Sequence, residues 1–232
     1  MAKRVMLKIS GEALSEEDRI FSIERADALA KSLVKVQKAG FELAVLTGGG
    51  NVWRGRIGQG MDAVTADQMG MLATVLNCIF LKDALVRHNA KARVMSAIEI
   101  PRFCEVVRQD IAKEKLAEGE IVLFAGGLGS PFFTTDTAVV LRAIEIGADT
   151  LLLAKSIDGV YTADPLEDSS AKLIKNISYE EAMAANLRVM DMSAFALCAD
   201  KGLPQVRVFS MNDPDNILKV LSGDTMGTTL YP

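Results

Sequence analysis

The sequence predicts an α/β fold in which helices cover both faces of a mostly parallel central sheet. Short apolar runs alternate with longer segments of helical periodicity over the 232 residues, as in chains built from strand–helix–strand units. Several of these runs are continuously apolar, which is typical of strands buried on both faces. Apolar residues make up 50% of the chain and charged residues 24%, a globular composition. No low-complexity linker divides the chain, so we expect a single domain over residues 1–232.

The apolar pattern assigns an element to most of the chain. It predicts strands at 5–9, 43–46, 93–95, 121–124, 150–154, 173–177, 206–209 and 228–230, the last of them at a sheet edge. It predicts helices at 23–39, 63–87, 111–116, 136–146, 179–186, 193–201 and 217–221. Gly40 marks the end of the first helix, and Thr135 or Asp136 is placed to cap the fourth. Residues 158–170 have the composition of turns.

Composition excludes several functional classes. The single histidine, His88, leaves little material for histidine metal sites and is the only candidate for a Ser-His-Asp triad. Cys78, Cys104 and Cys198 are widely spaced and form no C-x-x-C pair. We interpret them as buried core thiols of a protein in a reducing cytoplasm.

Charge and hydropathy argue against a nucleic acid or a membrane as partner. The 26 basic and 30 acidic residues give a net charge of −4, too mild for a nucleic-acid or membrane-surface binder. No apolar run approaches the ~18 residues that a membrane span needs. The residues after Lys3 and Arg4 form a strand-like segment rather than a secretion leader, so we expect a cytoplasmic protein.

Glycine-rich loops follow three of the predicted strands. They are Lys8-Ile9-Ser10-Gly11-Glu12, Thr47-Gly48-Gly49-Gly50-Asn51 and Ala125-Gly126-Gly127-Leu128-Gly129-Ser130. The carboxyl ends of parallel strands share one rim, and glycine lets backbone N–H groups approach an anion there. One such loop can be a plain turn, but three together indicate a phosphate site. The Walker loop, a G-x-G-x-x-G after the first strand and the protein-kinase H-R-D and D-F-G set are all missing.

Charged and aromatic residues near these loops suit a nucleotide. Lys8 and Arg54 can pair with phosphate oxygens, unless they are solvated surface charges. Asp67, early in the long helix, can accept hydrogen bonds from ribose hydroxyls or simply favour the helix N-terminus. Residues 131–136 and 158–165 combine aromatic and polar side chains that can hold a base. The alternatives are core phenylalanines with a helix cap, and an Asx-rich turn.

Six segments carry a resemblance to a known family over nearly the whole chain. They are Leu7–Leu14 (LKISGEAL), Gly48–Gly55 (GGGNVWRG), Asp67–Thr74 (DQMGMLAT), Pro131–Asp136 (PFFTTD), Asp158–Pro165 (DGVYTADP) and Val189–Asp191 (VMD). In order and spacing the chain resembles the amino acid kinase superfamily and, within it, the uridylate kinase family. The PFFTTD and DQMGMLAT segments make the resemblance specific, because the amino-acid-phosphorylating relatives lack them.

The resemblance implies a three-layer α/β/α sandwich that assembles as a homohexamer. It implies reversible transfer of the ATP γ-phosphoryl group to UMP, giving UDP and ADP, in pyrimidine nucleotide biosynthesis. It also implies an acceptor half at about 1–154 and an ATP-binding half at about 155–232. The UMP phosphate is largely ionised near neutral pH, since its second pKa is about 6, so no general base is needed.

The resemblance further implies the residues of the site. ATP contacts are implied at Lys8, Ile9, Ser10, Gly11, Gly50, Arg54, Lys155, Tyr161 and Asp164. UMP contacts are implied at Gly49, Asp67, Leu128, Gly129, Ser130, Pro131, Phe132, Phe133, Thr134 and Thr135. Lys8, Arg54 and Asp136 are implied as catalytic, with Mg²⁺ carried by the ATP phosphates rather than by a protein metal site.

Some positions depart from the family pattern. Leu128 stands where the family has a threonine in the uracil loop, and Lys155-Ser156 replaces a threonine or asparagine that contacts ATP. Residues 15–21 are acidic and lack glycine, and Lys82, Val86 and Glu120 stand at positions associated with GTP binding. Because a glutamate repels a triphosphate, we expect weak or no activation by GTP. UTP is the expected feedback inhibitor, because it can reuse the UMP pocket.

Two other functions remain open from the sequence. One is an enzyme of the same fold that phosphorylates a carboxylate or a carbamate, although such an acceptor needs neither Asp67 nor the Phe132–Phe133 pair. The other is a non-catalytic nucleotide-binding regulator, against which the joint presence of Lys8, Arg54 and Asp136 argues.

The long helix is apolar on more than one face. Its apolar residues include Met69, Met71, Leu72, Val75, Leu76, Ile79 and Leu81. We expect one side to pack in the core and the other against a neighbouring subunit, unless the whole helix is buried within one chain.

Overall fold

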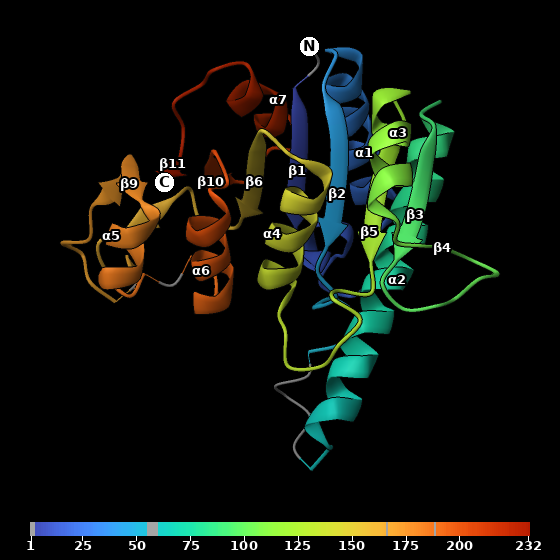
Figure 1. The fold of residues 1–232 in the computed structure, drawn as a ribbon, viewed down its shortest axis with the longest axis horizontal. Coiled ribbons are helices and arrows are strands. Elements are labelled where there is room, and N and C mark those ends of the chain that lie inside the picture. The colour runs from blue at the N-terminus through green and yellow to red at the C-terminus, as the bar shows by residue number, and fades with distance from the viewer. Residues whose placement is uncertain (1–2, 55–59, 166, 188) are drawn as a thin grey trace.

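The computed structural model describes residues 3–54, 60–165, 167–187 and 189–232, and in these residues nine strands form one central sheet (Figure 1). The strands are β1 (Arg4–Ile9), β2 (Glu42–Thr47), β3 (Ala92–Ser96), β4 (Glu105–Val106), β5 (Ile121–Ala125), β6 (Thr150–Lys155), β9 (Asn176–Ser178), β10 (Val206–Ser210) and β11 (Thr228–Tyr231). Their order is β4-β3-β5-β2-β1-β6-β10-β11-β9. Every neighbouring pair is parallel except β10 and β11, so the predicted mostly parallel sheet is confirmed.

Helices cover both faces of the sheet and give the predicted three-layer α/β/α sandwich. They are α1 (Ile23–Lys38), α2 (Ala63–Arg87), α3 (Gln109–Ala117), α4 (Thr135–Ile146), α5 (Tyr179–Ala184), α6 (Met192–Lys201) and α7 (Asn216–Leu221), with a 3₁₀ turn η1 (Gly11–Leu14). Helices α1, α2 and α7 pack in one apolar core, whereas α3, α4, α5 and α6 pack in the other.

The alternation of side chains along β1 places a lysine at the rim. Val5, Leu7 and Ile9 are fully buried on the α1–α2 side, and Met6 is buried on the α4 side. Because successive residues of a strand point to opposite faces, Lys8 points to the same side as Met6. The last polar residue of β1 therefore faces α4.

The cap of α4 differs from the prediction by one residue. Thr134, in extended conformation, accepts hydrogen bonds from the backbone N–H groups of Asp136 (3.0 Å) and Thr137 (3.4 Å). The predicted caps, Thr135 and Asp136, are instead the first two helical residues. Three consecutive residues of the TTD sequence can all cap a helix, so composition alone does not choose among them.

The predicted strand 173–177 divides between two sheets. β8 (Leu173–Ile174) pairs antiparallel with β7 (Val160–Tyr161), a strand inside the segment predicted as turns. β9 instead joins the central sheet beside β11, so the prediction of β11 as an edge strand is wrong. A period-two pattern shows that a segment is extended but not which neighbour it pairs with.

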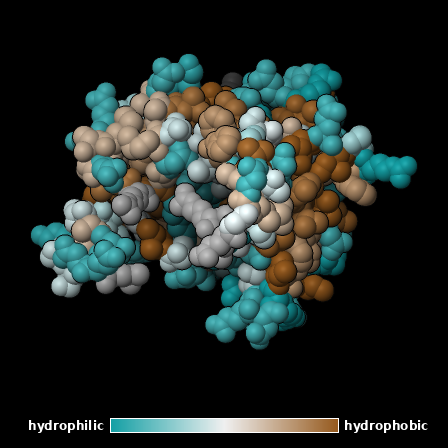
Figure 2. Space-filling model, turned by 90° about the horizontal axis from the view of Figure 1, so that it is seen from below, coloured by the Kyte–Doolittle hydropathy of each residue, from teal (hydrophilic) through white to brown (hydrophobic). Residues whose placement is uncertain are grey.

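Helix α2 has one buried side and one exposed apolar side. By length and composition it is long and apolar enough to cross a membrane. The sequence analysis had expected no segment of this kind. Its residues Val75, Cys78 and Leu81 are buried in the α1–α2 core, as in the core helix of a globular protein. On the other side Met69, Leu72, Leu76, Ile79 and Val86 are exposed. Figure 2 shows apolar side chains gathered along the flank where α2, β3 and β4 lie.

Candidate active site

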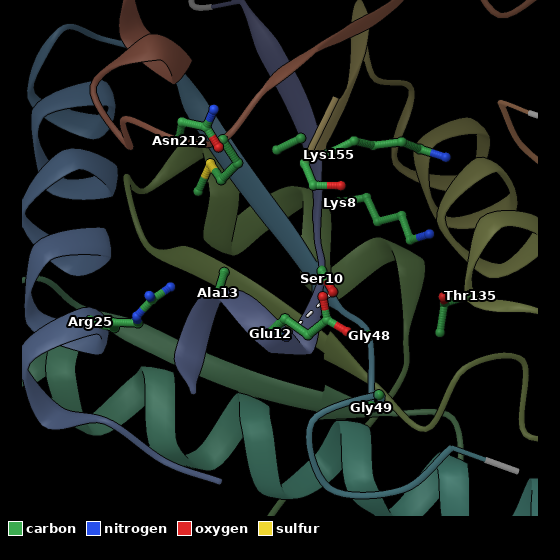
Figure 3. A pocket seen from close by; sticks show the side chains of 14 residues that line it. Lys8, Ser10, Glu12, Ala13, Arg25, Gly48, Gly49, Thr135, Lys155 and Asn212 are labelled. Atoms are coloured by element: carbon green, nitrogen blue, oxygen red, sulfur yellow. Dashed lines mark hydrogen bonds between the residues drawn. The ribbon is translucent and has the colours of Figure 1, made fainter. Parts of the chain in front are cut away.

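A cavity of about 520 Å³, called here the central cavity, opens where β1, β2, β6 and β10 end (Figure 3). It is lined by Lys8, Ser10, Glu12, Ala13, Arg25, Gly48, Gly49, Gly50, Thr135, Ala154, Lys155, Ser156, Met211 and Asn212. β1 lies between β2 and β6, so the chain order reverses at this point of the sheet. In open α/β sheets such a reversal opens a crevice for ligands at the carboxyl ends of the strands.

The glycine loops of this rim pack directly on one another. Asn77 donates from its side chain to the Gly48 carbonyl (2.6 Å) and is itself bonded to Asn51 (2.8 and 3.0 Å). A Cβ on Gly11 would lie 2.1 Å from the Asn51 side-chain oxygen, and one on Gly49 would lie 2.9 Å from the Gly70 carbonyl. A side chain is therefore excluded at Gly11 and at Gly49. At Gly49, which lines the cavity, a ligand meets the backbone instead.

Two lysines extend along one side of the central cavity. Lys8 forms an ion pair with Asp136, and both side chains are mostly buried. Lys155 donates to the Val189 carbonyl. Burial lowers the pKa of Lys155, with nearby Lys8 acting in the same direction and Asp136 opposing it. Figure 3 shows the two ammonium groups close together, with Arg25 on the opposite side of the cavity.

Arg54 lies on the surface beside the glycine loop. Its Nε donates to the Gly50 carbonyl (3.2 Å), and its guanidinium group pairs with Glu12, both side chains being more than half exposed. Arg54 is not among the described residues that line the cavities. Its contact with phosphates stays a prediction.

A second, smaller cavity of about 140 Å³ adjoins the first and is called here the side cavity. Its lining consists of Gly49, Gly50, Trp53, Ala66, Asp67, Gly70, Met71, Thr74, Gly127, Leu128, Ser130, Phe133 and Thr135. Gly49, Gly50 and Thr135 line both cavities, so two ligands would meet at these residues.

Asp67 joins helix α2 to the loop before α4. Its Oδ2 accepts a hydrogen bond from the Phe132 backbone N–H (2.7 Å). Phe132 has φ of +70°, a left-handed conformation that is rare for a bulky residue, and its side chain is 73% exposed. The alternative that Phe132 and Phe133 are core residues is therefore wrong, since both are exposed.

A third cavity, called here the distal cavity, measures about 520 Å³. Its lining is Ile157, Val160, Tyr161, Thr162, Ala163, Asp164, Pro165, Glu167, Ala185, Asn186, Leu187 and Val189. It adjoins the central cavity at the consecutive residues Ser156 and Ile157, and the Lys155–Val189 hydrogen bond joins one wall residue of each. The Tyr161 hydroxyl donates to Asp158 (2.7 Å), and this bond raises the pKa of Tyr161.

The sequence model of the Amino acid kinase family matches residues 3–210. The chain belongs to the amino acid kinase family.

Solved structures of UMP kinases are similar to this member of the family over its whole length. The UMP kinase of Bacillus anthracis is 35% identical with a TM-score of 0.95, over 99% of this chain and 96% of that one. The UMP kinase of Ureaplasma parvum is 32% identical with a TM-score of 0.94, over 100% of both chains. The uridylate kinase of Archaeoglobus fulgidus is 26% identical with a TM-score of 0.73, over 98% of this chain and 99% of that one. The resemblance and the fold inferred from the sequence motifs are thus confirmed.

The structure distributes the predicted residues of this amino acid kinase over the three cavities. Lys8, Ser10, Gly50 and Lys155 line the central cavity, whereas Tyr161 and Asp164 line the distal one. Gly49, Asp67, Leu128, Ser130, Phe133 and Thr135 line the side cavity. Ile9, Gly11, Gly129, Pro131, Phe132 and Thr134 lie next to wall residues in the chain, but are not among the described lining residues.

Sequence reasoning missed several wall residues. They include Arg25, Met211 and Asn212 of the central cavity and Trp53 of the side cavity. Arg25 comes from the first turn of α1, and Met211 and Asn212 follow β10. Only the order of the strands brings these segments to the same rim, and no local motif signals it.

Asp191 of the VMD segment connects two helices beside the site. It caps α6 by accepting from the Ala194 N–H (2.8 Å), and it accepts from the hydroxyls of Thr137 (3.0 Å) and Thr134. Burial acts to raise the pKa of Asp191, but these hydrogen bonds outweigh it and lower the pKa. The ionised carboxylate therefore fastens the start of α4 to α6.

Protein ligands for a metal are sparse in the described part of the chain. Within it, no group of three or more histidine, cysteine, aspartate or glutamate side chains is placed to hold a metal ion. Asp136, paired with Lys8, is the carboxylate that adjoins the two cavity lysines. A magnesium ion at this rim would need further oxygen ligands from phosphates or water, and these residues fit an ion that arrives with a nucleotide.

Proposed function

We propose that this amino acid kinase is a UMP kinase, which transfers the γ-phosphoryl group of ATP to UMP and gives UDP and ADP. The observation that carries the proposal is the shared wall of the central and side cavities at Gly49, Gly50 and Thr135. Two anionic ligands, one in each cavity, would present their phosphates to the same backbone amides and cations. The similar solved structures are those of UMP kinases, which supports the choice of acceptor.

Each cavity then takes one part of the substrates. The ATP phosphates lie in the central cavity at Lys8, Ser10 and Gly50, and the adenine lies in the distal cavity beside Tyr161. UMP lies in the side cavity, with its ribose at Asp67. In this arrangement residues 1–154 supply the acceptor half and residues 155–232 supply most of the ATP half.

The transfer itself needs charge neutralisation more than covalent help. A UMP phosphate oxygen forms a bond to the γ-phosphorus while the bond to the ADP bridging oxygen breaks, and the electron pair leaves with ADP. No proton has to move, because the acceptor oxygen is already ionised. Lys8, Lys155 and the loop amides offset the repulsion between the two polyanions, and Asp136 orients Lys8. Mg²⁺ carried by the ATP phosphates would supply further positive charge at the transferred group.

An ADP-release assay with a panel of acceptors tests the proposal. We expect magnesium-dependent ADP release with UMP and none with acetylglutamate, aspartate or carbamate. Turnover of a carboxylate or carbamate but not of UMP would replace the proposal with the first alternative. Nucleotide binding without any turnover would favour the non-catalytic regulator.

Regulation and assembly belong to the same proposal. UTP inhibits by competing with UMP for the side cavity. GTP activates weakly or not at all, because the acidic Glu120, which pairs with Arg93 (2.7 Å), stands where the family pattern has a basic residue. The exposed apolar side of α2 packs against another subunit in a homo-oligomer, which we propose is a hexamer in the cytoplasm.

A further inference from the structure

Trp53 is the only tryptophan of the chain and lies in the loop between β2 and α2. A tight turn fixes its position, because the backbone N–H groups of Trp53 (2.9 Å) and Val52 (3.0 Å) both donate to the Gly49 carbonyl. Its side chain lines the side cavity together with Gly49 and Asp67. The tryptophan is therefore held on the same loop whose glycines separate the two cavities.

The indole nitrogen of Trp53 is buried and has no hydrogen-bond partner among the residues that the structure describes. In the described residues, Arg142 Nε and Arg207 Nε are likewise buried without a hydrogen-bond partner, and His88 Nε2 has only an ion-pair contact with Asp27 (3.3 Å). Those three residues are not among the described lining residues of the central, side or distal cavity. An indole N–H can only donate, and burying a donor without an acceptor is unfavourable. The position of Trp53 in the cavity wall makes a ligand the natural acceptor.

Two other polar groups of the same wall, Thr74 and Asp67, already have partners. The Thr74 hydroxyl donates to the Met71 carbonyl (2.7 Å) and accepts from the Gly126 N–H (2.8 Å). Asp67 accepts from Phe132. The Trp53 N–H, by contrast, lacks an acceptor among the described residues. Because Trp53 is tied to Gly49, where the two cavities meet, the phosphate end of an acceptor nucleotide is the group it would reach.

We propose that Trp53 donates its indole N–H to a phosphate oxygen of the acceptor nucleotide and so helps to select the acceptor. This inference rests on the proposed function and adds a specificity-determining residue to it. A hydrogen bond to a charged oxygen is stronger than one between neutral groups, so its loss should be visible in the affinity for the acceptor alone.

The test uses two replacements that remove the N–H group. Trp53→Phe keeps an aromatic ring, and β-3-benzothienylalanine at position 53 keeps the bicyclic shape with sulfur in place of the N–H. We expect both to raise the KM for UMP about tenfold and to leave the KM for ATP within twofold. A purely structural role would be rescued by the bicyclic analogue, whereas a donor role would not.

Fluorescence gives an independent readout, because Trp53 is the sole tryptophan. We expect UMP alone to shift or quench the emission of the unmodified enzyme, and ATP alone to leave it nearly unchanged. An unchanged KM for UMP in both replacements, with normal turnover of UMP by the unmodified enzyme, overturns the inference and leaves the proposed function standing. Absence of both UMP turnover and a UMP-dependent emission change in the unmodified enzyme overturns both.

Discussion

Lys8 has the largest role of any side chain in the proposed transfer. It stands at the end of β1, faces α4 through the alternation of the strand and pairs with Asp136. We expect Lys8→Ala to fold but to lower kcat at least 10²- to 10³-fold, as for other groups that neutralise charge in a transition state. Steady-state kinetics with ATP and UMP would measure the loss.

A matched lysine elsewhere controls for the loss of an ion pair. Lys35 pairs with Asp215 (2.7 Å) on the surface, outside the described lining of the three cavities. Lys35→Ala should keep kcat within twofold. Near-normal turnover by a folded Lys8→Ala protein would reject the role given to Lys8.

The burial of Lys155 predicts that the free energy of unfolding depends on pH. Its pKa is lowered in the folded protein, mainly by burial. Between that lowered pKa and the ordinary lysine value, the unfolded chain binds more protons than the folded one, so the free energy of unfolding rises with pH. Lys155→Met lacks this titration. In urea unfolding from pH 7 to 10, the wild type should gain stability relative to the variant as the pH rises. A constant difference between the two proteins would contradict the lowered pKa.

Residues of the site differ in how far the sequence reveals them. Lys8 and the glycines stand in short local motifs at strand ends, so their place at the rim was predictable from local pattern. Arg25 carries no such signal, because its position in a cavity wall depends on which strands are neighbours. Thr134 was missed as a cap because the two following residues have equal capping chemistry.

At the scale of elements, Asp191 links α4 to α6. It caps α6 and accepts from two threonines near the start of α4. We expect Asp191→Ala to lower the free energy of unfolding by about 2 kcal/mol, because a cap and hydrogen bonds to a carboxylate are lost together. Urea denaturation would measure the change.

Ser178 provides the control for Asp191→Ala, because it caps a helix and, in the described residues, its side chain bonds only to Glu181 of that helix. It caps α5 through the Glu181 N–H (3.1 Å) in a local capping box. Ser178→Ala should cost about 1 kcal/mol. Equal costs for the two variants would mean that the bonds from Asp191 to α4 contribute nothing measurable.

Element positions were predictable wherever the apolar pattern was long and regular. The predicted bounds of α1 and α2 agree with the structure within one residue, since each helix has a clear start or stop signal. The prediction of one strand over 173–177 was wrong, because a segment this short does not reveal which strand it pairs with. Lys175 in fact separates two strands that belong to different sheets. The sequence pattern placed β11 at the edge of the sheet because it does not show that β9, a distant segment, pairs with β11.

At the scale of the whole molecule, the exposed side of α2 predicts association. Leu72 and Leu76 are each about half exposed, and they share one side with Met69 and Ile79. A contiguous apolar stripe on a long helix is typical of a subunit interface. We expect Leu76→Lys to reduce the molar mass measured by light scattering in dilute solution.

Met192 supplies the control, because it is 52% exposed and begins α6, on the face of the sheet opposite to α2. Met192→Lys should leave the molar mass unchanged. A monomeric wild type, or a Leu76→Lys variant that associates as the wild type does, would refute the interface.

In the proposed function, two nucleotides meet head to head at the shared wall of the central and side cavities. A crystal structure with UMP and a non-hydrolysable ATP analogue would locate both of them. We predict that the UMP phosphate and the terminal phosphate of the analogue lie next to each other at Gly49 and Gly50, within reach of Lys8. Phosphates bound away from this wall, or a rim that takes up no nucleotide, would contradict the account.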